Sequence, residues 1–302
     1  MLALIAPGQG SQTPGMLNSW IVDSSTKNLL SAWSKEIDLD LVHLGTTADA
    51  DEIKDTANAQ PLIVATSLLA VHALALDNIA VTSGHSVGEL AAAAISGAIT
   101  AGDALTLVRA RGVEMAKAAA LIPTGMSAVL GGDRNEVVAA IQALGLVAAN
   151  ENGGGQIVAA GDLTGLAALG ENPPQGARVR PLSVAGAFHT SYMSAAVAPL
   201  SDLAATITTH QPLIPFISNR DGVVVRTGSE IVARIVNQIA NPVRWDLCMQ
   251  SLKTMGVTGV IELPPAGTLV GLLKRAAPEI ESFALKSALD IDAAREFAGR
   301  HM

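Results

Sequence analysis

Short apolar runs that stop at turn residues alternate with longer stretches of helical periodicity along this chain. Residues 2–6 are all apolar and stop at Pro7-Gly8, and residues 79–82 form a second short run before a glycine-rich turn. Runs without polar alternation are typical of buried parallel strands. Helices are expected over residues 60–76, 89–95 and 100–120. Pro61 is expected in the first turn of its helix, where a missing N–H does no harm.

The pattern changes after Pro123. Strands are expected at residues 126–130, 147–150, 156–160 and 178–185, and helices at residues 133–144 and 163–169. This β-α-β-β-α-β order is the ferredoxin-like pattern, so we expect an inserted ferredoxin-like small subdomain at residues 124–188. The first pattern then resumes, with helices after residue 191 and at 231–239 and 268–275, and strands at 215–218 and 257–262. The fold expected is α/β, with an α/β-hydrolase-like core that has a parallel sheet and comprises residues 1–123 and 189–302.

The amino-acid composition excludes several classes of protein. The chain has 302 residues, 49% of them hydrophobic and 15% charged, which excludes a disordered chain and supplies a sizeable core. The length suits about two ordinary domains or one large α/β domain with an insertion. The net charge of −8 argues against a protein that coats nucleic acid, because phosphate binding needs a basic surface.

Cysteine usage and the apolar runs bear on location and metals. Cys248 is the only cysteine, so no internal disulfide and no cysteine-based zinc site can form. Histidines and carboxylates do not show metal-ligand spacing, so no metal is expected. The N-terminal apolar run has no basic lead, and the longest apolar stretch, residues 62–76, is broken by polar side chains. We expect neither a signal peptide nor a membrane span, and a cytoplasmic location.

The candidate chemistry begins at Gly84-His-Ser-Val-Gly88, which matches the G-x-S-x-G nucleophile elbow. A strand feeds a turn whose neighbours must be tiny, and the hydroxyl of Ser86 is lifted above the strand end. The amide of Val87 points toward the same space, at the start of a helix whose positive end favours an oxyanion. The alternative is an ordinary strand–helix connection in which a serine caps the helix.

A serine nucleophile needs a base, and histidine is the usual one. His189 follows Gly186-Ala-Phe188 at the expected seam between the two subdomains, where clefts form. His85 precedes the serine and is expected to project away from it and to orient the elbow from the edge of the substrate site. The remaining histidines are expected to be solvated or interior, namely His43, His72, His210 and His301.

Five motifs occur in order and together carry a family resemblance. They are Gly8-Gln-Gly-Ser-Gln12, Gly84-His-Ser-Val-Gly-Glu89, Arg111, Gly186-Ala-Phe-His189 and Gln238-Ile-Ala-Asn-Pro-Val243. The chain resembles the malonyl-CoA:acyl carrier protein transacylases of bacterial type II fatty-acid synthesis and the related acyltransferase domains of polyketide synthases. The resemblance runs from Pro7 to about Arg275. Two departures, at residues 264–267 and 150–155, concern loop shape and touch no catalytic atom.

The resemblance implies a role for each matching residue. Ser86 is the nucleophile, and His189 takes its proton and returns it to the leaving thiol. The histidine is oriented by a backbone carbonyl, at the position of Gln238, and the backbone amides of Gln9 and Val87 form the oxyanion hole.

Arg111 is implied to clamp the free carboxylate of the malonyl group with two parallel hydrogen bonds. The helical pattern by itself does not separate Arg111 from Arg109, since both flank the apolar face and either could be solvated. Phe188, just before the histidine, resembles the pattern of malonyl-selective acyltransferases. An aromatic ring at this position leaves less room for the branch methyl of a methylmalonyl group.

The function expected is an S-malonyltransferase that moves a malonyl group from malonyl-CoA to the phosphopantetheine thiol of a holo acyl carrier protein. The CoA thioester is a substrate, and no cofactor is expected. The other expectations are a monomer with no nucleic-acid or membrane partner. Lys274, Arg275 and Lys286 are either basic contacts for phosphate or carrier, or part of an ordinary charged surface. A serine esterase or thioesterase using the same pair, and a non-catalytic carrier scaffold, are the alternatives. The residues do not separate a fatty-acid from a polyketide pathway.

Overall fold

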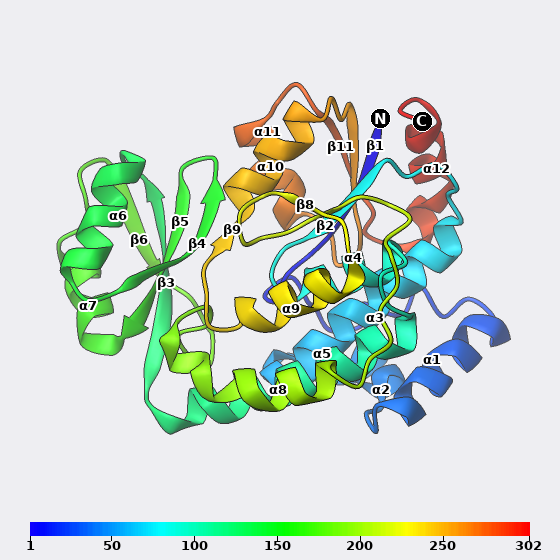
Figure 1. Cartoon of the computed structure of the whole chain (residues 1–302), viewed down its shortest axis with the longest axis horizontal. Coiled ribbons are helices and arrows are strands. Elements are labelled where there is room, and N and C mark those ends of the chain that lie inside the picture. Colours follow the sequence, from blue (N-terminus) through cyan, green and yellow to red (C-terminus); the bar gives the residue numbers. More distant parts are fainter.

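The computed structural model describes residues 1–302 and shows a mixed α/β fold built on two sheets (Figure 1). The larger sheet has six strands, which are parallel except for the antiparallel pair at one edge. In spatial order they are β11 (Glu281–Ala284), β10 (Gly259–Glu262), β1 (Leu2–Ala6), β2 (Val81–Gly84), β7 (Phe216–Ile217) and β8 (Val224–Val225).

Strand β1 shows why this sheet is buried on both faces. All five of its residues are buried, and it pairs in parallel with β2 on one side and β10 on the other. Since side chains alternate along a strand, Leu2 and Leu4 join the hydrophobic cluster on one face, whereas Ala3 and Ile5 join the cluster on the other. The continuous apolar run is thus divided between two cores.

Helices cover both faces of this sheet, as Figure 1 shows. On one face the cluster is supplied by α3 (Thr56–Leu74), α4 (Gly88–Ile95), α5 (Ala101–Leu121) and α9 (Gly228–Gln238). On the other face it is supplied by α10 (Trp245–Thr254) and α11 (Thr268–Ala276). The remaining helices around this unit are α1 (Ser24–Glu36), α2 (Leu41–Thr46), α8 (Val197–Ala204) and α12 (Ile291–Gly299), with short 3₁₀ turns at 52–54, 191–196 and 288–290.

The smaller sheet has five strands and lies at the left in Figure 1. In spatial order they are β6 (Ala177–Pro181), β3 (Thr124–Gly131), β5 (Gln156–Asp162), β4 (Val147–Gly153) and β9 (Val243–Arg244). Helices α6 (Arg134–Ala143) and α7 (Leu163–Glu171) supply apolar side chains to the small core of this unit. The β-α-β-β-α-β order expected from the sequence is present, and its strands pair antiparallel.

The fifth strand of the small sheet comes from a distant part of the chain. Strand β9 pairs in parallel with β4, with Val243 opposite Asn150. The sequence analysis did not predict β9, because two residues are too short to show a period. The segment after residue 189 therefore crosses back to the small sheet and ties the two units together.

Several element boundaries differ from those predicted. Strand β2 runs over Val81–Gly84 instead of residues 79–82, because buried Ser83 belongs to it although it is polar, and Gly84 extends it to the turn. Strand β6 ends at Pro181 and not at residue 185, because after one further bond to β3, from Leu182 N to Met126 O, the chain turns, with Val184 N donating to Leu182 O. The elements that the sequence analysis did not predict are α1, α2, β8, β9, α10, β11 and α12.

Helix α3 begins at Thr56, so Pro61 lies inside it and not in its first turn as predicted. Asp55 accepts a hydrogen bond from Ala57 N at 2.7 Å and starts the helix earlier. Pro61 has no N–H for the carbonyl of Ala57, four residues before it. Arg109 Nη1 donates to that carbonyl at 2.9 Å instead, so a side chain of α5 replaces the missing helical bond.

Helix α3 is the one helix that is long and apolar enough, by length and composition alone, to cross a membrane. It has 19 residues, and an 18-residue window of it has a mean hydropathy of 1.3. In the structure 72% of that window is buried inside the protein, which is the behaviour of a core helix. The prediction relied on an uninterrupted apolar run, whereas the average over the helix tolerates Thr66, Ser67 and His72.

The contact between Arg109 and Ala57 predicts a coupled effect on stability. Arg109→Met keeps the stem but leaves the Ala57 carbonyl without a donor, so we expect a loss of about 1–2 kcal/mol in the free energy of unfolding. Pro61→Ala restores the N–H, and the double variant should lose less than the sum of the single losses. Urea denaturation measures all three. Strictly additive losses would contradict this account of Arg109.

Candidate active site

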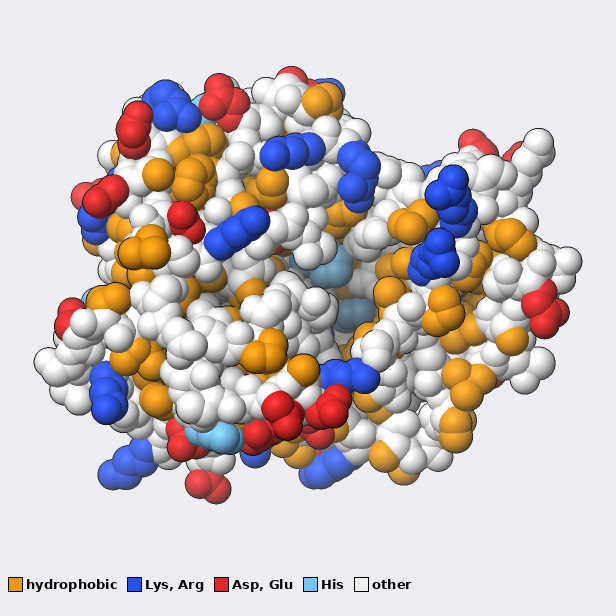
Figure 2. Space-filling view, turned by 180° about the vertical axis from the view of Figure 1, so that it is seen from behind, with side chains coloured by type: hydrophobic (Ala, Val, Ile, Leu, Met, Phe, Trp, Pro, Cys, Tyr) orange, Lys and Arg blue, Asp and Glu red, His pale blue; other side chains and the backbone are white.

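A cavity of about 220 Å³ lies where the two units meet. Figure 2 shows the hollow from the outside, with histidine side chains at its bottom and Lys and Arg side chains around it. One wall comes from the loop after β1, the elbow after β2 and helix α5, and the opposite wall comes from the small sheet. Among its lining residues are Gln9, His85, Ser86, Arg111 and Phe188, together with His189.

The turn between β2 and α4 forces Ser86 into a conformation that few side chains adopt. Its φ is +54°, in the left-handed region. A Cβ on Gly84 would lie 2.0 Å from the carbonyl carbon of Gly88, and a Cβ on Gly88 would lie 2.3 Å from the oxygen of Ala6. Both glycines are therefore required by close backbone approach, and the hydroxyl of Ser86 is presented at the end of the strand.

His189 lies beside this hydroxyl, although 103 residues separate the two in sequence. Its Nε2 is 2.8 Å from Ser86 Oγ, and its Nδ1 is 2.9 Å from the backbone oxygen of Gln238. Because a carbonyl only accepts, Nδ1 carries the proton and Nε2 presents its lone pair to the serine. Burial, followed by the charge of Arg111, lowers the pKa of His189 to about 3, so the ring is neutral at physiological pH.

Arg111 is the charged group of the cavity. It is 1% exposed, and its hydrogen-bond partners are neutral: Gln60 Oε1 at 2.6 Å, Ser86 Oγ at 3.2 Å and Gln238 Oε1 at 3.5 Å. Its Nε has no partner in the protein. Burial lowers the pKa of Arg111 to about 10, which still leaves it ionised at neutral pH. The structure separates the two arginines that the sequence could not, since Arg111 faces the cavity and Arg109 faces α3.

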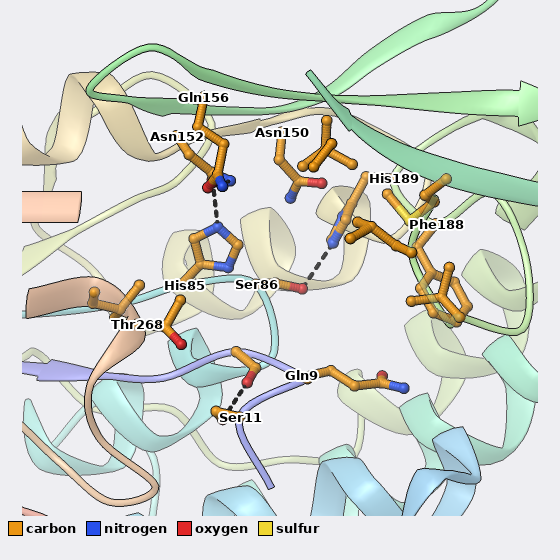
Figure 3. Close-up of a pocket in the computed structure, with 18 of the residues that line it drawn as sticks. Gln9, Ser11, His85, Ser86, Asn150, Asn152, Gln156, Phe188, His189 and Thr268 are labelled. Carbon is orange, nitrogen blue, oxygen red and sulfur yellow. Dashed lines mark hydrogen bonds between the residues drawn. The ribbon is translucent and has the colours of Figure 1, made fainter. Parts of the chain in front are cut away.

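The loop after β1 lies below Ser86 in Figure 3. Ser11 Oγ donates to Gly8 O at 2.7 Å, and Gln9 Nε2 donates to Thr56 Oγ1 at 3.2 Å, so the loop is held on both sides. The backbone amides of Gln9 and Val87 donate no hydrogen bond within the protein. Both remain available to an oxygen that develops negative charge near Ser86.

His85 points away from Ser86, as the sequence analysis expected (Figure 3). Its Nε2 is 2.8 Å from Asn152 Oδ1, and its ring meets Trp245 edge-on at 5.7 Å between centroids. Burial lowers the pKa of His85. The side chain also lines the cavity, so it links the elbow to the small sheet at the edge of the substrate space.

Several residues around the dyad were not picked out from the sequence. Asn219 Oδ1 accepts from Ser86 N at 2.8 Å, and Gln60 holds Arg111. Glu89 is 1% exposed, and burial raises its pKa to about 8. Glu89 lies in the quoted elbow motif and could have been noticed there, whereas Asn219 carries no local signal. No group of three or more His, Cys, Asp or Glu side chains is placed to hold a metal ion.

Comparisons with known proteins agree with this arrangement. The family described as acyl transferase domain matches residues 4–295. A Mycobacterium tuberculosis protein named malonyl CoA-acyl carrier protein transacylase is 52% identical over 297 residues, 97% of this chain and 98% of that protein. The crystal structure of MCAT from Mycobacterium tuberculosis has a TM-score of 0.94 at 51% identity, covering 98% of this chain and 99% of that one. A structure described as a type II PKS acyl-carrier protein in complex with its malonyl-transacylase has a TM-score of 0.91 at 26% identity, covering 98% and 99%.

The fold and the site define an α/β enzyme of the class that carries acyl groups on a serine. A hydroxyl at a strand end, a neutral histidine beside it and free amides next to it are what that chemistry requires. The chain belongs to the acyl transferase domain family and, among its members, to the malonyl CoA-acyl carrier protein transacylases.

The lowered pKa of His189 predicts how its ring responds to acid. We expect it to stay neutral from pH 7 to pH 5, as read from the ring resonances in NMR spectra with His189→Gln as the assignment control. Because the folded-state pKa is depressed, this residue stabilises the fold above about pH 6.5, and that stability is lost as the pH falls through about 3. A ring that titrates near pH 6.5 in the folded protein would contradict the account.

Proposed function

We propose that the protein transfers a malonyl group from malonyl-CoA to the phosphopantetheine thiol of a holo acyl carrier protein, through an ester on Ser86. The observation that carries the proposal is the buried guanidinium of Arg111, 3.2 Å from Ser86 Oγ and without a carboxylate among its hydrogen-bond partners. In a malonyl thioester one methylene separates the carboxylate from the reacting carbonyl. An arginine next to the nucleophile can therefore bind the one while the serine attacks the other.

In the first half-reaction Ser86 Oγ forms a bond to the thioester carbonyl carbon, and its proton passes to His189 Nε2. The amides of Gln9 and Val87 stabilise the oxyanion, typically worth about 10²–10³ in rate for each such donor. The carbon–sulfur bond then breaks, and the histidine returns the proton to the CoA thiolate. The second half repeats these steps in reverse with the carrier thiol. Thioester, ester and thioester are close in energy, so no cofactor is needed.

Binding of the substrate is also expected to change the pKa of the base, His189. The charge of Arg111 is the second cause, after burial, of the low pKa of His189. A bound malonyl carboxylate neutralises that charge, so it raises the pKa of His189 at the moment when a base is required. An acetyl group brings no such charge. Arg111 thus favours malonyl over acetyl as the acyl group, and the names of the relatives and the solved carrier complex, not this coupling, speak against the esterase alternative.

The acyl carrier protein as partner is supported by the names of the relatives and by the solved complex of a malonyl-transacylase with an acyl-carrier protein. Lys274, Arg275 and Lys286 are exposed and make no ion pair, so they are available to an acidic carrier or to CoA phosphates. A monomer in the cytoplasm is part of the proposal. Phe188, which lines the cavity at 6% exposure, is proposed to limit the acyl group to an unbranched one.

We propose a more specific fold for each of the two units. The parallel strand order of the large sheet, with a serine elbow after β2, supports an α/β-hydrolase-like core at residues 1–123 and 189–302. The order β6-β3-β5-β4, with two helices on the small unit, supports a ferredoxin-like subdomain at residues 124–188. Strand β9 is the one strand from the core segment that joins the small sheet.

A competition assay tests the proposal. Holo-carrier is given equal malonyl-CoA and acetyl-CoA, and acyl-carriers and free acids are measured. The wild type should make malonyl-carrier with little free malonate. Arg111→Ala should lose roughly 100-fold or more in kcat/KM for malonyl-CoA and gain relative activity with acetyl-CoA, because the malonyl carboxylate would be buried unpaired.

Arg109→Ala is the matched control, an arginine two residues earlier in the same helix that faces away from the cavity. It should lose stability and keep the malonyl preference. Release of free malonate by the wild type, faster than transfer to the carrier, would instead identify a hydrolase.

A further inference from the structure

A buried carboxylate that the proposed mechanism does not use joins the two halves of the catalytic pair. Glu89 lies in the first turn of α4 and is 1% exposed. Its Oε1 accepts a hydrogen bond from the backbone N–H of Asn219 at 2.6 Å, and its Oε2 accepts one from Gln238 Nε2. Both donors belong to residues more than 100 positions away in the sequence.

Asn219 connects Glu89 to the nucleophile. Its Oδ1 accepts from the backbone N–H of Ser86 at 2.8 Å, and its Nδ2 donates to Gly84 O at 2.7 Å. The amide of Asn219 therefore spans the elbow and bonds to the backbone on both sides of His85. A shift of Asn219 would move the backbone that sets the strained φ of Ser86.

Gln238 connects Glu89 to the base. Its backbone oxygen accepts from His189 Nδ1 at 2.9 Å, and its side-chain Nε2 donates both to Glu89 and to Asn219 Oδ1, the latter at 3.1 Å. With the contact between His189 Nε2 and Ser86 Oγ at 2.8 Å, the hydrogen bonds form a closed ring through Glu89.

We propose that Glu89 is a positioning residue for the acyl transfer, which holds Asn219 and Gln238 so that Ser86 and His189 keep their hydrogen-bonding distance. The inference rests on the proposed function, because it concerns the same two reacting groups. Glu89 does not touch the substrate space, since it does not line the cavity.

The site requires an acceptor at each oxygen of position 89, and a carboxyl group supplies both, since its hydroxyl oxygen can still accept when the raised pKa of about 8 leaves it protonated. A glutamine has one acceptor oxygen and one donor nitrogen. The backbone N–H of Asn219 cannot reverse its role, so the glutamine oxygen must face it, and the glutamine nitrogen then meets Gln238 Nε2. If Gln238 turned its amide over, its nitrogen would face Arg111 Nη2, which now lies 3.5 Å from Gln238 Oε1. In either arrangement two N–H donors face each other and no acceptor lies between them.

Glu89→Gln is the test, measured as malonyl transfer to holo-carrier. We expect kcat to fall by about 10-fold to 100-fold, because small misplacements of reacting groups cost this much. The KM for malonyl-CoA should stay within about twofold, since Arg111 and the cavity walls are retained. The downfield NMR signal of the His189 Nδ1 proton should shift, which a general loss of stability would not produce in a folded sample.

Glu262→Gln is the matched control. Glu262 is fully buried like Glu89, and its carboxylate also accepts backbone N–H groups, from Gly267 at 2.8 Å and Leu269 at 3.0 Å, at the start of α11. It has no bond to the ring. This variant should lose stability and keep kcat. An equal loss of kcat in both variants would reduce Glu89 to a structural role and overturn the proposal.

A double variant covers the case in which Glu89→Gln folds poorly. Gln238→Met removes the opposing donor and keeps the backbone carbonyl that His189 needs. Glu89→Gln with Gln238→Met should lose less activity than the product of the two single losses, and a strictly multiplicative loss would contradict the inference. The proposed function fails separately, if the wild type does not transfer malonyl groups at all.

Discussion

The close approach of two backbone segments at the elbow is the constraint on which the site depends. Gly84 and Gly88 pack so tightly that neither could carry a side chain, and Ser86 between them is held at a φ of +54°. A left-handed serine costs free energy, of order 1–3 kcal/mol for a residue in such a region. The surrounding hydrogen bonds, above all those of Asn219, offset this cost and fix the direction in which the hydroxyl leaves the strand.

The balance of charge in the protein is the second constraint on the site. The protein carries a net charge of −8, and its proposed substrate and partner are also anionic. Inside the cavity, the positive charge for an anionic substrate comes from Arg111, which is almost wholly buried and hydrogen-bonded to neutral groups. Inside a low-dielectric site one such group outweighs the distant surface charges, which salt and water screen. Burial, and after it the same charge, keep the histidine neutral, and a bound carboxylate would offset the second of these causes, so recognition of the substrate is coupled to the basicity of His189.

The sequence predicted the parts of this structure that local pattern controls. The elbow motif, the apolar strand β1 and the β-α-β-β-α-β order of the small unit each have a period or spacing that can be read directly. The geometry brings Ser86, His189 and Arg111 together, as the resemblance implied. The contribution of Gln238 through its backbone oxygen could be expected only from the resemblance, because a carbonyl carries no trace of its residue type.

The features that the sequence did not predict depend on contacts between segments that are distant along the chain. Asn219 meets Ser86 across 133 positions, and the replacement of the missing Pro61 hydrogen bond by Arg109 depends on how two helices pack. Strand β9 has only two residues and exists because β4 is there to receive it. Local propensity contains none of this information, since tertiary packing decides it.

The central claim is that Ser86 carries the malonyl group between two thiols. Intact mass spectrometry with peptide mapping tests it most directly, on wild type and Ser86→Ala mixed with malonyl-CoA and then with holo-carrier. The account predicts one malonyl adduct on the wild type, located at Ser86 and discharged to the carrier, and no adduct on the variant. An adduct that persists in Ser86→Ala, or transfer by that variant at the wild-type rate, would contradict it.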